Sequence, residues 1–139
     1  MSQDKVILLV EDNDDDVELT TMAFAKAKIT NKLMVARDGV EAIEYLFGEG
    51  AHAGRDARDQ PVVVLLDLKL PRLNGFAVLE TIRARPASRT TVVVLTGSTL
   101  RDDRTRAQDL AADLFVTKPV GVEAYVQEMR RFRELALAH

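Results

Sequence analysis

PVVVLLDLKLPRLNG, residues 61–75, joins an unbroken apolar run to a single carboxylate, Asp67, and then to a turn. An apolar run this short, without alternation, fits a strand that is buried on both faces, as in a parallel sheet. Periodicity alone also allows a buried helical turn, but the proline at its start favours the strand. Pro71 and the Asn-Gly pair after it break the pattern. We therefore expect Asp67 at the carboxyl end of a central strand, the edge where open α/β sheets bind ligands.

Length and composition narrow the class of protein. The chain has 139 residues, which suits one domain, and we expect residues 1–139 to form it. A net charge of −3 without a dominant Lys/Arg cluster argues against a general nucleic-acid binder. The absence of cysteine excludes disulfides and thiolate zinc sites and fits a reducing compartment. No segment approaches the roughly 20 apolar residues of a membrane span. We expect a cytoplasmic protein that binds neither nucleic acid nor membrane.

Five short apolar or β-branched runs each precede a segment with helical periodicity. The expected strands cover residues 5–10, 32–37, 61–66, 90–95 and 114–117, and the expected helices cover residues 14–28, 40–47, 75–84, 100–111 and 121–139. Residues 48–60 contain three glycines and charges of both signs, which predicts an exposed loop of unusual length. Five strand-helix units with right-handed crossovers predict an α/β fold, a (βα)5 doubly wound parallel sheet with helices on both faces.

The strand order that fits this pattern best is 2-1-3-4-5, with its switch point between the first and third strands. Glu11 and Asp12 follow the first strand, and Asp67 follows the third. The three carboxylates should therefore converge at one edge of the sheet, although they are far apart in the sequence. Thr96 and Lys118, at the ends of the fourth and fifth strands, should reach the same edge.

This set of side chains predicts a specific chemistry. Clustered carboxylates repel one another unless a cation offsets them, and an all-oxygen cluster suits Mg²⁺. Thr96 would add a hydroxyl donor and Lys118 a positive charge. Phosphoryl transfer needs an oxygen nucleophile, a metal ion and donors for the phosphoryl oxygens, and Asp67 is the natural nucleophile. Each signal alone has an ordinary explanation, such as a solvated helix start or a Lys-Pro turn, but their combination at four strand ends favours a functional site.

Together these residues resemble the receiver domains of two-component response regulators, with a flavodoxin-like receiver fold, over almost the whole chain. The matching residues are Glu11 and Asp12, Asp67, the turn at residues 71–75, Thr96, and Lys118 with Pro119. The resemblance implies that Asp67 accepts a phosphoryl group from the phosphohistidine of a sensor histidine kinase. It further implies that Asp12, Asp67 and the main-chain carbonyl of Lys69 bind Mg²⁺, and that Glu11 holds the ion through water.

The resemblance also assigns roles after phosphorylation. Thr96 and Lys118 would bind the phosphoryl oxygens, and Phe115 would turn inward as Thr96 moves, unless Phe115 is simply part of the core. Lys69 and Ser98 stand at the positions that shape attack by water, which leaves the lifetime of the phosphoryl group open. The 48–60 loop, the Glu-Asp-Asn start of the acidic turn and the lack of an output domain resemble the small single-domain regulators paired with bacterial phytochrome histidine kinases.

The signal would leave through the face formed by residues 100–111, residues 114–117 and the last helix. We expect a homodimer built on the last helix and the adjoining strand, since Phe132, Leu135 and Leu137 lie beyond the part that a small sheet can cover. A frayed amphipathic tail is the alternative.

Two other classes of protein compete with this interpretation. A haloacid dehalogenase-like phosphohydrolase would need a second Asp two residues after Asp67, where Lys69 stands. A flavin-binding module would need a glycine- and hydroxyl-rich loop after the first strand and aromatic walls, but only 5% of the residues are aromatic.

Overall fold

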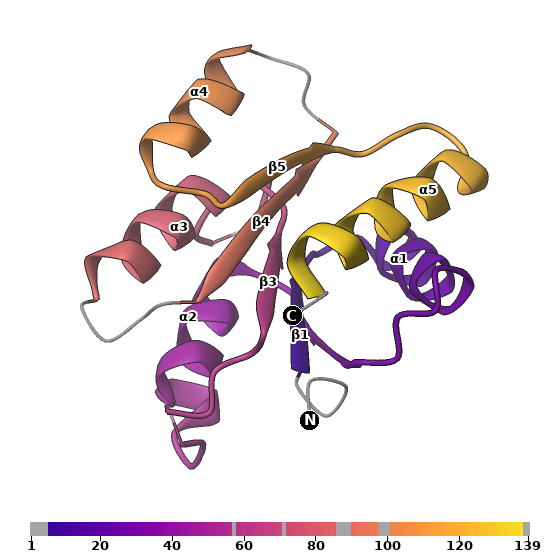
Figure 1. Ribbon diagram of the computed structural model, residues 1–139. Helices are drawn as coiled ribbons and strands as arrows, with labels where there is room; N and C mark the ends of the chain where they lie inside the picture. Colours follow the sequence, from indigo (N-terminus) through magenta and orange to yellow (C-terminus); the bar gives the residue numbers. More distant parts are fainter. Residues whose placement is uncertain (1–5, 57, 71, 86–89, 98–100, 138–139) are drawn as a thin grey trace.

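A computed structural model describes residues 6–56, 58–70, 72–85, 90–97 and 101–137, without the side chains of residues 136 and 137. Five parallel strands form one sheet in the order β2-β1-β3-β4-β5 (Figure 1). The strands are β1 (Val6–Val10), β2 (Lys32–Ala36), β3 (Val63–Leu66), β4 (Thr91–Thr96) and β5 (Leu114–Thr117). The predicted doubly wound α/β fold and its strand order are therefore confirmed.

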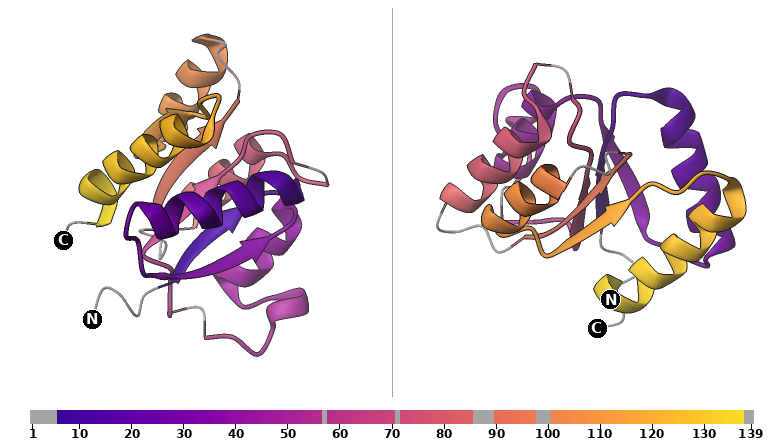
Figure 2. Two further views of the ribbon diagram at one scale, coloured as in Figure 1. Left: turned by 90° about the vertical axis from the view of Figure 1, so that its right-hand side faces the viewer. Right: turned by 90° about the horizontal axis from the view of Figure 1, so that it is seen from above.

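The helices lie on both faces of the sheet, as Figure 2 shows in the view from above. They are α1 (Asp14–Lys26), α2 (Gly39–Phe47), α3 (Gly75–Ala84), α4 (Arg101–Asp109) and α5 (Val122–Phe132). Helices α1 and α5 pack on one face, and α2, α3 and α4 pack on the other. In the described part of the chain, no helix combines the length and the apolar composition that crossing a membrane would require.

The strands are buried on both faces, as their continuous apolar runs predicted. Leu8, Val10, Val64 and Leu66 face the α2 and α3 side, whereas Ile7, Leu9, Val63 and Leu65 face the α1 and α5 side. All eight side chains are buried because each face of a doubly wound sheet is covered by helices. The edge strand β2, which begins with an exposed lysine, is less buried than β1 and β3.

Side-chain caps fix where three of the helices begin. The side chains of Asn13, Asp38 and Asn74 accept hydrogen bonds from the main-chain N–H groups three residues later, at 3.0, 2.8 and 3.0 Å. Each cap satisfies one of the N–H groups that the first turn of a helix leaves without a partner. Helices α1 and α2 start shortly beyond the carboxyl ends of β1 and β2, and α3 starts after the longer loop that follows β3, so all three begin near the functional residues.

The predicted loop at residues 48–60 is largely exposed, but side chains fix it to α2. It contains a short 3₁₀ turn, Gly50–His52. Arg55 donates to the Tyr45 carbonyl at 2.6 Å and to the Asp59 carbonyl at 2.7 Å, and its guanidinium lies 4.0 Å from the centre of the Tyr45 ring. Polar loop residues therefore give this segment a defined shape that hydrophobic periodicity did not predict.

The end of the chain corrects one expectation. Phe132 was predicted to lie beyond the packed part of the last helix, but it is only 1% exposed and stacks on Phe24 of α1, with ring centres 6.0 Å apart. The prediction was wrong because α1 extends the surface on which α5 packs. A π-helical turn, Arg133–Leu137, follows α5, and its Leu135 is 52% exposed. The side chain of Leu137 lies outside the described part.

Candidate functional site

The predicted convergence of carboxylates occurs at the carboxyl edge of the sheet. Val10 pairs with Leu66, so the residues that follow them, Glu11 and Asp67, emerge side by side. Oxygen atoms of Glu11, Asp12 and Asp67 lie within 4.8 Å of one another. Hydrogen bonds from the Glu11 N–H to the Ala36 carbonyl, at 2.9 Å, and from the Asp67 N–H to the Val10 carbonyl, at 3.1 Å, extend the sheet to this point.

The three carboxylates differ in how they meet solvent. Glu11 is 2% exposed and Asp67 is 9% exposed, whereas Asp12 is exposed. Hard divalent cations prefer oxygen ligands, and Mg²⁺ in particular combines one or two protein carboxylates with retained water. A cluster with an exposed side, made only of carboxylate oxygens, fits such an ion. The residues present therefore suit Mg²⁺ or Mn²⁺.

Lys118, the residue after β5, places its ammonium within this cluster. Its Nζ atom lies 2.5 Å from Glu11 Oε1, 3.0 Å from Asp16 Oδ2 and 3.6 Å from Asp67 Oδ2. Burial disfavours the charged ammonium, but the hydrogen bond to Glu11 and the charges of Asp67 and Glu11 outweigh it and raise the pKa of Lys118 above its ordinary range. Lys118 is therefore a fixed cation close to the carboxylate of Asp67.

Burial also disfavours the charged form of Glu11, which for a carboxyl group means a higher pKa. The pKa of Glu11 is raised to about 7, mainly by burial and in part by the negative charge of Asp67, although the Lys118 hydrogen bond lowers it. One ammonium among several carboxylates does not compensate all of their charge. The site consequently has a deficit of positive charge, which a divalent cation would remove.

Asp16 is a site residue that the sequence analysis missed. It lies in the first turn of α1, where acidic residues are ordinarily explained by the helix dipole, so its sequence position gave no separate signal. Its carboxylate receives a hydrogen bond from Lys118. Its carbonyl accepts from the Thr20 hydroxyl at 2.8 Å, and that hydroxyl lies 2.6 Å from the Tyr125 hydroxyl of α5. A polar chain therefore runs from the site to α5.

The remaining predicted residues lie at or near the same edge. Thr96 ends β4 and is fully buried, and its carbonyl accepts from the Lys118 N–H at 2.6 Å. The Lys69 N–H donates to Asp67 Oδ1 at 3.2 Å. Phe115 is half-buried on β5 against the α2–α4 cluster, with the Arg104 guanidinium 5.6 Å from its ring centre. Ser98 lies outside the described residues.

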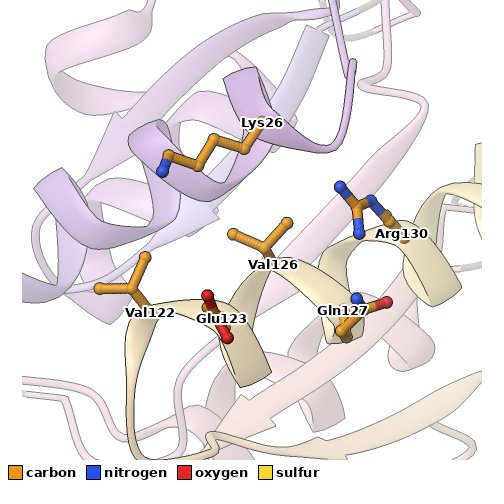
Figure 3. Close-up of a pocket in the computed structure, with 6 residues that line it drawn as sticks. All are labelled: Lys26, Val122, Glu123, Val126, Gln127 and Arg130. Carbon is orange, nitrogen blue, oxygen red and sulfur yellow. The ribbon is translucent and has the colours of Figure 1, made fainter.

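A groove of about 490 Å³ lies elsewhere, between α1 and α5 (Figure 3). It is lined by Lys26, Val122, Glu123, Val126, Gln127 and Arg130, none of which belongs to the carboxylate cluster. Val122, the first residue of α5, is exposed there. The carboxylates and Lys118 therefore form a site at the sheet edge that is separate from this groove.

A doubly wound sheet whose carboxyl edge brings together an acidic pair, a strand-end Asp, a Thr and a Lys defines a receiver domain. The profile of the response regulator receiver domain matches residues 7–130, so the chain belongs to this family. Membership gives no support to the haloacid dehalogenase alternative, because the receiver domain family is not one of classical enzymes.

Within the family, the chain is similar to regulators associated with phytochromes. Response regulator Rcp1 of Synechocystis is 36% identical over 115 residues, covering 82% of this chain and 76% of Rcp1. The crystal structure of the phosphorylated cyanobacterial phytochrome response regulator RcpA has a TM-score of 0.88 and 35% identity, covering 97% of this chain and 95% of RcpA. The bacteriophytochrome response regulator AtBRR has a TM-score of 0.77 and 41% identity, with 91% of both chains covered.

A solved structure of Rcp1 contains bound Mn²⁺. Rcp1 is 32% identical to this chain in that comparison, with a TM-score of 0.86, and 96% of this chain and 95% of that one are covered. This likeness agrees with the carboxylate cluster of this chain in indicating a divalent metal site.

Proposed function

We propose that this chain is the phosphoacceptor of a two-component phosphorelay, and that Asp67 receives a phosphoryl group from the phosphohistidine of a sensor histidine kinase. The observation that carries the proposal is the position of the Asp67 carboxylate, at the end of a buried strand, within 4.8 Å of two other carboxylates and 3.6 Å from an ammonium. A carboxylate nucleophile, a cation site and a fixed positive charge are the parts that phosphoryl transfer requires.

In this reaction an oxygen of Asp67 attacks phosphorus in line with the leaving imidazole nitrogen. The P–N bond breaks, a P–O bond forms, and the nitrogen retains the electron pair of the broken bond. Water later hydrolyses the aspartyl phosphate and restores the carboxylate. The chain thus catalyses its own phosphorylation and dephosphorylation, and we propose that Lys69, exposed beside Asp67, and Ser98 tune the attack by water.

Asp12, Asp67 and the carbonyl of Lys69 would bind Mg²⁺, with Glu11 acting through water. The bound ion would neutralise the charge that the carboxylates and the phosphoryl oxygens accumulate. Glu11 suits the indirect role because it is buried and already hydrogen-bonded to Lys118.

Lys118 and Thr96 would bind the phosphoryl oxygens. The ammonium of Lys118 lies within 4 Å of Asp67, so it can pair with a new oxygen there while it retains Asp16. Because Thr96 ends the strand that precedes α4, a shift of Thr96 toward the phosphoryl group would change the face formed by α4, β5 and α5, with Phe115 turning inward.

The central assignment is tested by intact-mass analysis after incubation with acetyl phosphate and Mg²⁺. The wild-type protein should gain one phosphoryl group, and Asp67→Asn should gain none. The same adduct on Asp67→Asn would refute the assignment. Turnover of a phosphate ester, in place of a single labelling, would restore the phosphohydrolase alternative.

The kinase partner would be phytochrome-like, as the names of the similar regulators suggest. This pairing would place the protein in the cytoplasm, where kinases obtain ATP. Phosphotransfer from a panel of purified histidine kinases checks it. A phytochrome kinase should label Asp67 faster than kinases of other sensory classes, and equal rates across the panel would contradict the pairing.

We also propose that the single receiver domain, residues 1–139, signals as a homodimer through α5, its terminal turn and the edge strand β5. Leu135 is exposed beside Thr91, Val93, Asp113 and Leu114, where it lines a groove of about 220 Å³ at the sheet edge. Leu135→Asp should therefore weaken the dimer without unfolding the protein, whereas a charge at the buried Phe132 would disrupt the core. A monomer mass by light scattering at all concentrations, with and without beryllofluoride, would refute the dimer.

A further inference from the structure

The loop after β3 is joined to the start of α2 by an ion pair that the proposed chemistry does not use. Arg72 donates from Nε and Nη2 to the two carboxylate oxygens of Asp38, each at 3.0 Å. A guanidinium that binds both oxygens of one carboxylate restricts orientation as well as distance. Asp38 also caps α2 through the Glu41 N–H, so it is fixed to a rigid element.

The position of this pair in the fold is informative. Asp38 follows β2 and Arg72 follows β3, and these strands lie on opposite sides of β1 in the sheet. A contact between them must therefore span the carboxyl end of β1, which leads to Glu11 and Asp12. The pair links the two chain segments that flank the carboxylate cluster.

Backbone packing makes the same connection. Gly39, the first residue of α2, has no room for a Cβ atom because the carbonyl of Leu73 lies directly against it. The loop itself is closed at its base, since the Gly75 N–H donates to the Leu68 carbonyl at 3.0 Å. Arg72 adopts a left-handed backbone conformation, with φ of 62°, so the chain turns at this residue. Movement of α2 relative to the loop would therefore move Lys69, which lies between the base and the tip.

We propose that the Asp38–Arg72 pair is a positioning device for the divalent cation, because it fixes the loop from which the Lys69 carbonyl reaches the metal. This inference rests on the proposed function, in which that carbonyl is a ligand. The side chain of Arg72 is 57% exposed, so the pair adds little to the stability of the fold. Its contribution is to orientation, as for other residues that support metal ligands from behind.

Arg72→Gln separates positioning from simple electrostatics. Removing a positive charge near a cation site should by itself tighten cation binding. Loss of positioning should weaken cation binding. We expect the dissociation constant to rise about tenfold, which is at the lower end of the range for supporting residues. The measurement is titration of the protein with Mn²⁺, followed by electron paramagnetic resonance of the free ion, which needs no phosphotransfer activity.

Arg85→Gln is the matched control. Arg85 follows the last residue of α3, at the end of the helix away from the carboxylate cluster, and its partly exposed side chain pairs with Glu49 at 3.0 Å. This variant should bind Mn²⁺ as wild type does. The double variant Asp38→Asn with Arg72→Gln should bind no more weakly than the weaker single variant, since an asparagine in place of Asp38 can still cap α2 and the two residues act as one unit.

The outcomes separate this inference from the proposed function. Wild-type protein that binds no Mn²⁺ would remove the metal site and the inference with it. Wild-type binding together with equal or tighter binding by Arg72→Gln would overturn the inference alone. If Arg72→Gln does not fold, Arg72→Lys decides, because it retains the charge and loses the two-pronged geometry. Weaker binding by Arg72→Lys supports positioning, and unchanged binding overturns it.

Discussion

The buried carboxyl of Glu11 predicts an unusual dependence of stability on pH in the metal-free protein. Its pKa is raised from 4.5 to about 7 by burial, opposed by the Lys118 hydrogen bond. Between these values the folded protein binds a proton that the unfolded chain releases. The free energy of unfolding should therefore fall as pH rises from about 4.5 to about 7, and remain level above that.

The raised pKa corresponds to at most about 3 kcal/mol of lost stability at pH 8. Lys118 contributes no slope in this window, since its pKa is raised above its ordinary value of 10.5 and the ammonium stays charged. Asp38, whose pKa is lowered mainly by hydrogen bonds that outweigh its burial, acts with the opposite sign and only below its ordinary value of 3.8. Glu11 is therefore the group to test between pH 5 and 8.

Glu11→Gln should remove most of this slope, because the amide has the same shape, can still accept from Lys118 and does not titrate. The assay is urea unfolding followed by circular dichroism at several pH values with a chelator present. Glu128→Gln, which alters an exposed ion pair with Arg131, is the control and should keep the wild-type slope. Parallel pH profiles for wild type and Glu11→Gln would refute the reasoning. Saturating Mg²⁺ should stabilise the wild type most at high pH, where Glu11 is ionised.

Three other predictions concern neighbouring contacts. Asp12→Ala should weaken Mg²⁺ binding by calorimetry more than Glu11→Ala does, because Asp12 is assigned as the direct ligand, and equal affinities of Asp12→Ala and wild type would contradict the metal site. Tyr125→Phe should destabilise the protein by about 1 kcal/mol in urea unfolding, since it removes the buried hydrogen bond to Thr20, and an unchanged midpoint would argue against that bond. Phe132→Asp should abolish cooperative unfolding because it places a charge against Phe24, whereas a variant that still folds cooperatively would contradict the burial of Phe132 in the core.

Several features of the fold could be predicted from local sequence because they depend on burial patterns. The runs before Glu11 and Asp67 are apolar on both faces, and only a strand in a covered parallel sheet buries both faces of so short a segment. Alternation of strands with helices then limited the topology, and the topology brought Glu11, Asp12 and Asp67 to one edge. The convergence of the carboxylates was thus determined by the sequence alone.

Contacts between side chains from distant segments were decided only by tertiary packing. Asp16 resembled an ordinary first-turn acid until Lys118 was seen to reach it, and Arg72 resembled a turn residue until Asp38 was found opposite. Phe132 was misjudged for the same reason, since the extent of a buried face depends on the helix beside it, and Phe132 packs against Phe24 of α1. Hydrophobic periodicity shows which face of a helix or strand is buried. It does not show which other element packs against that face, because any apolar surface can bury it.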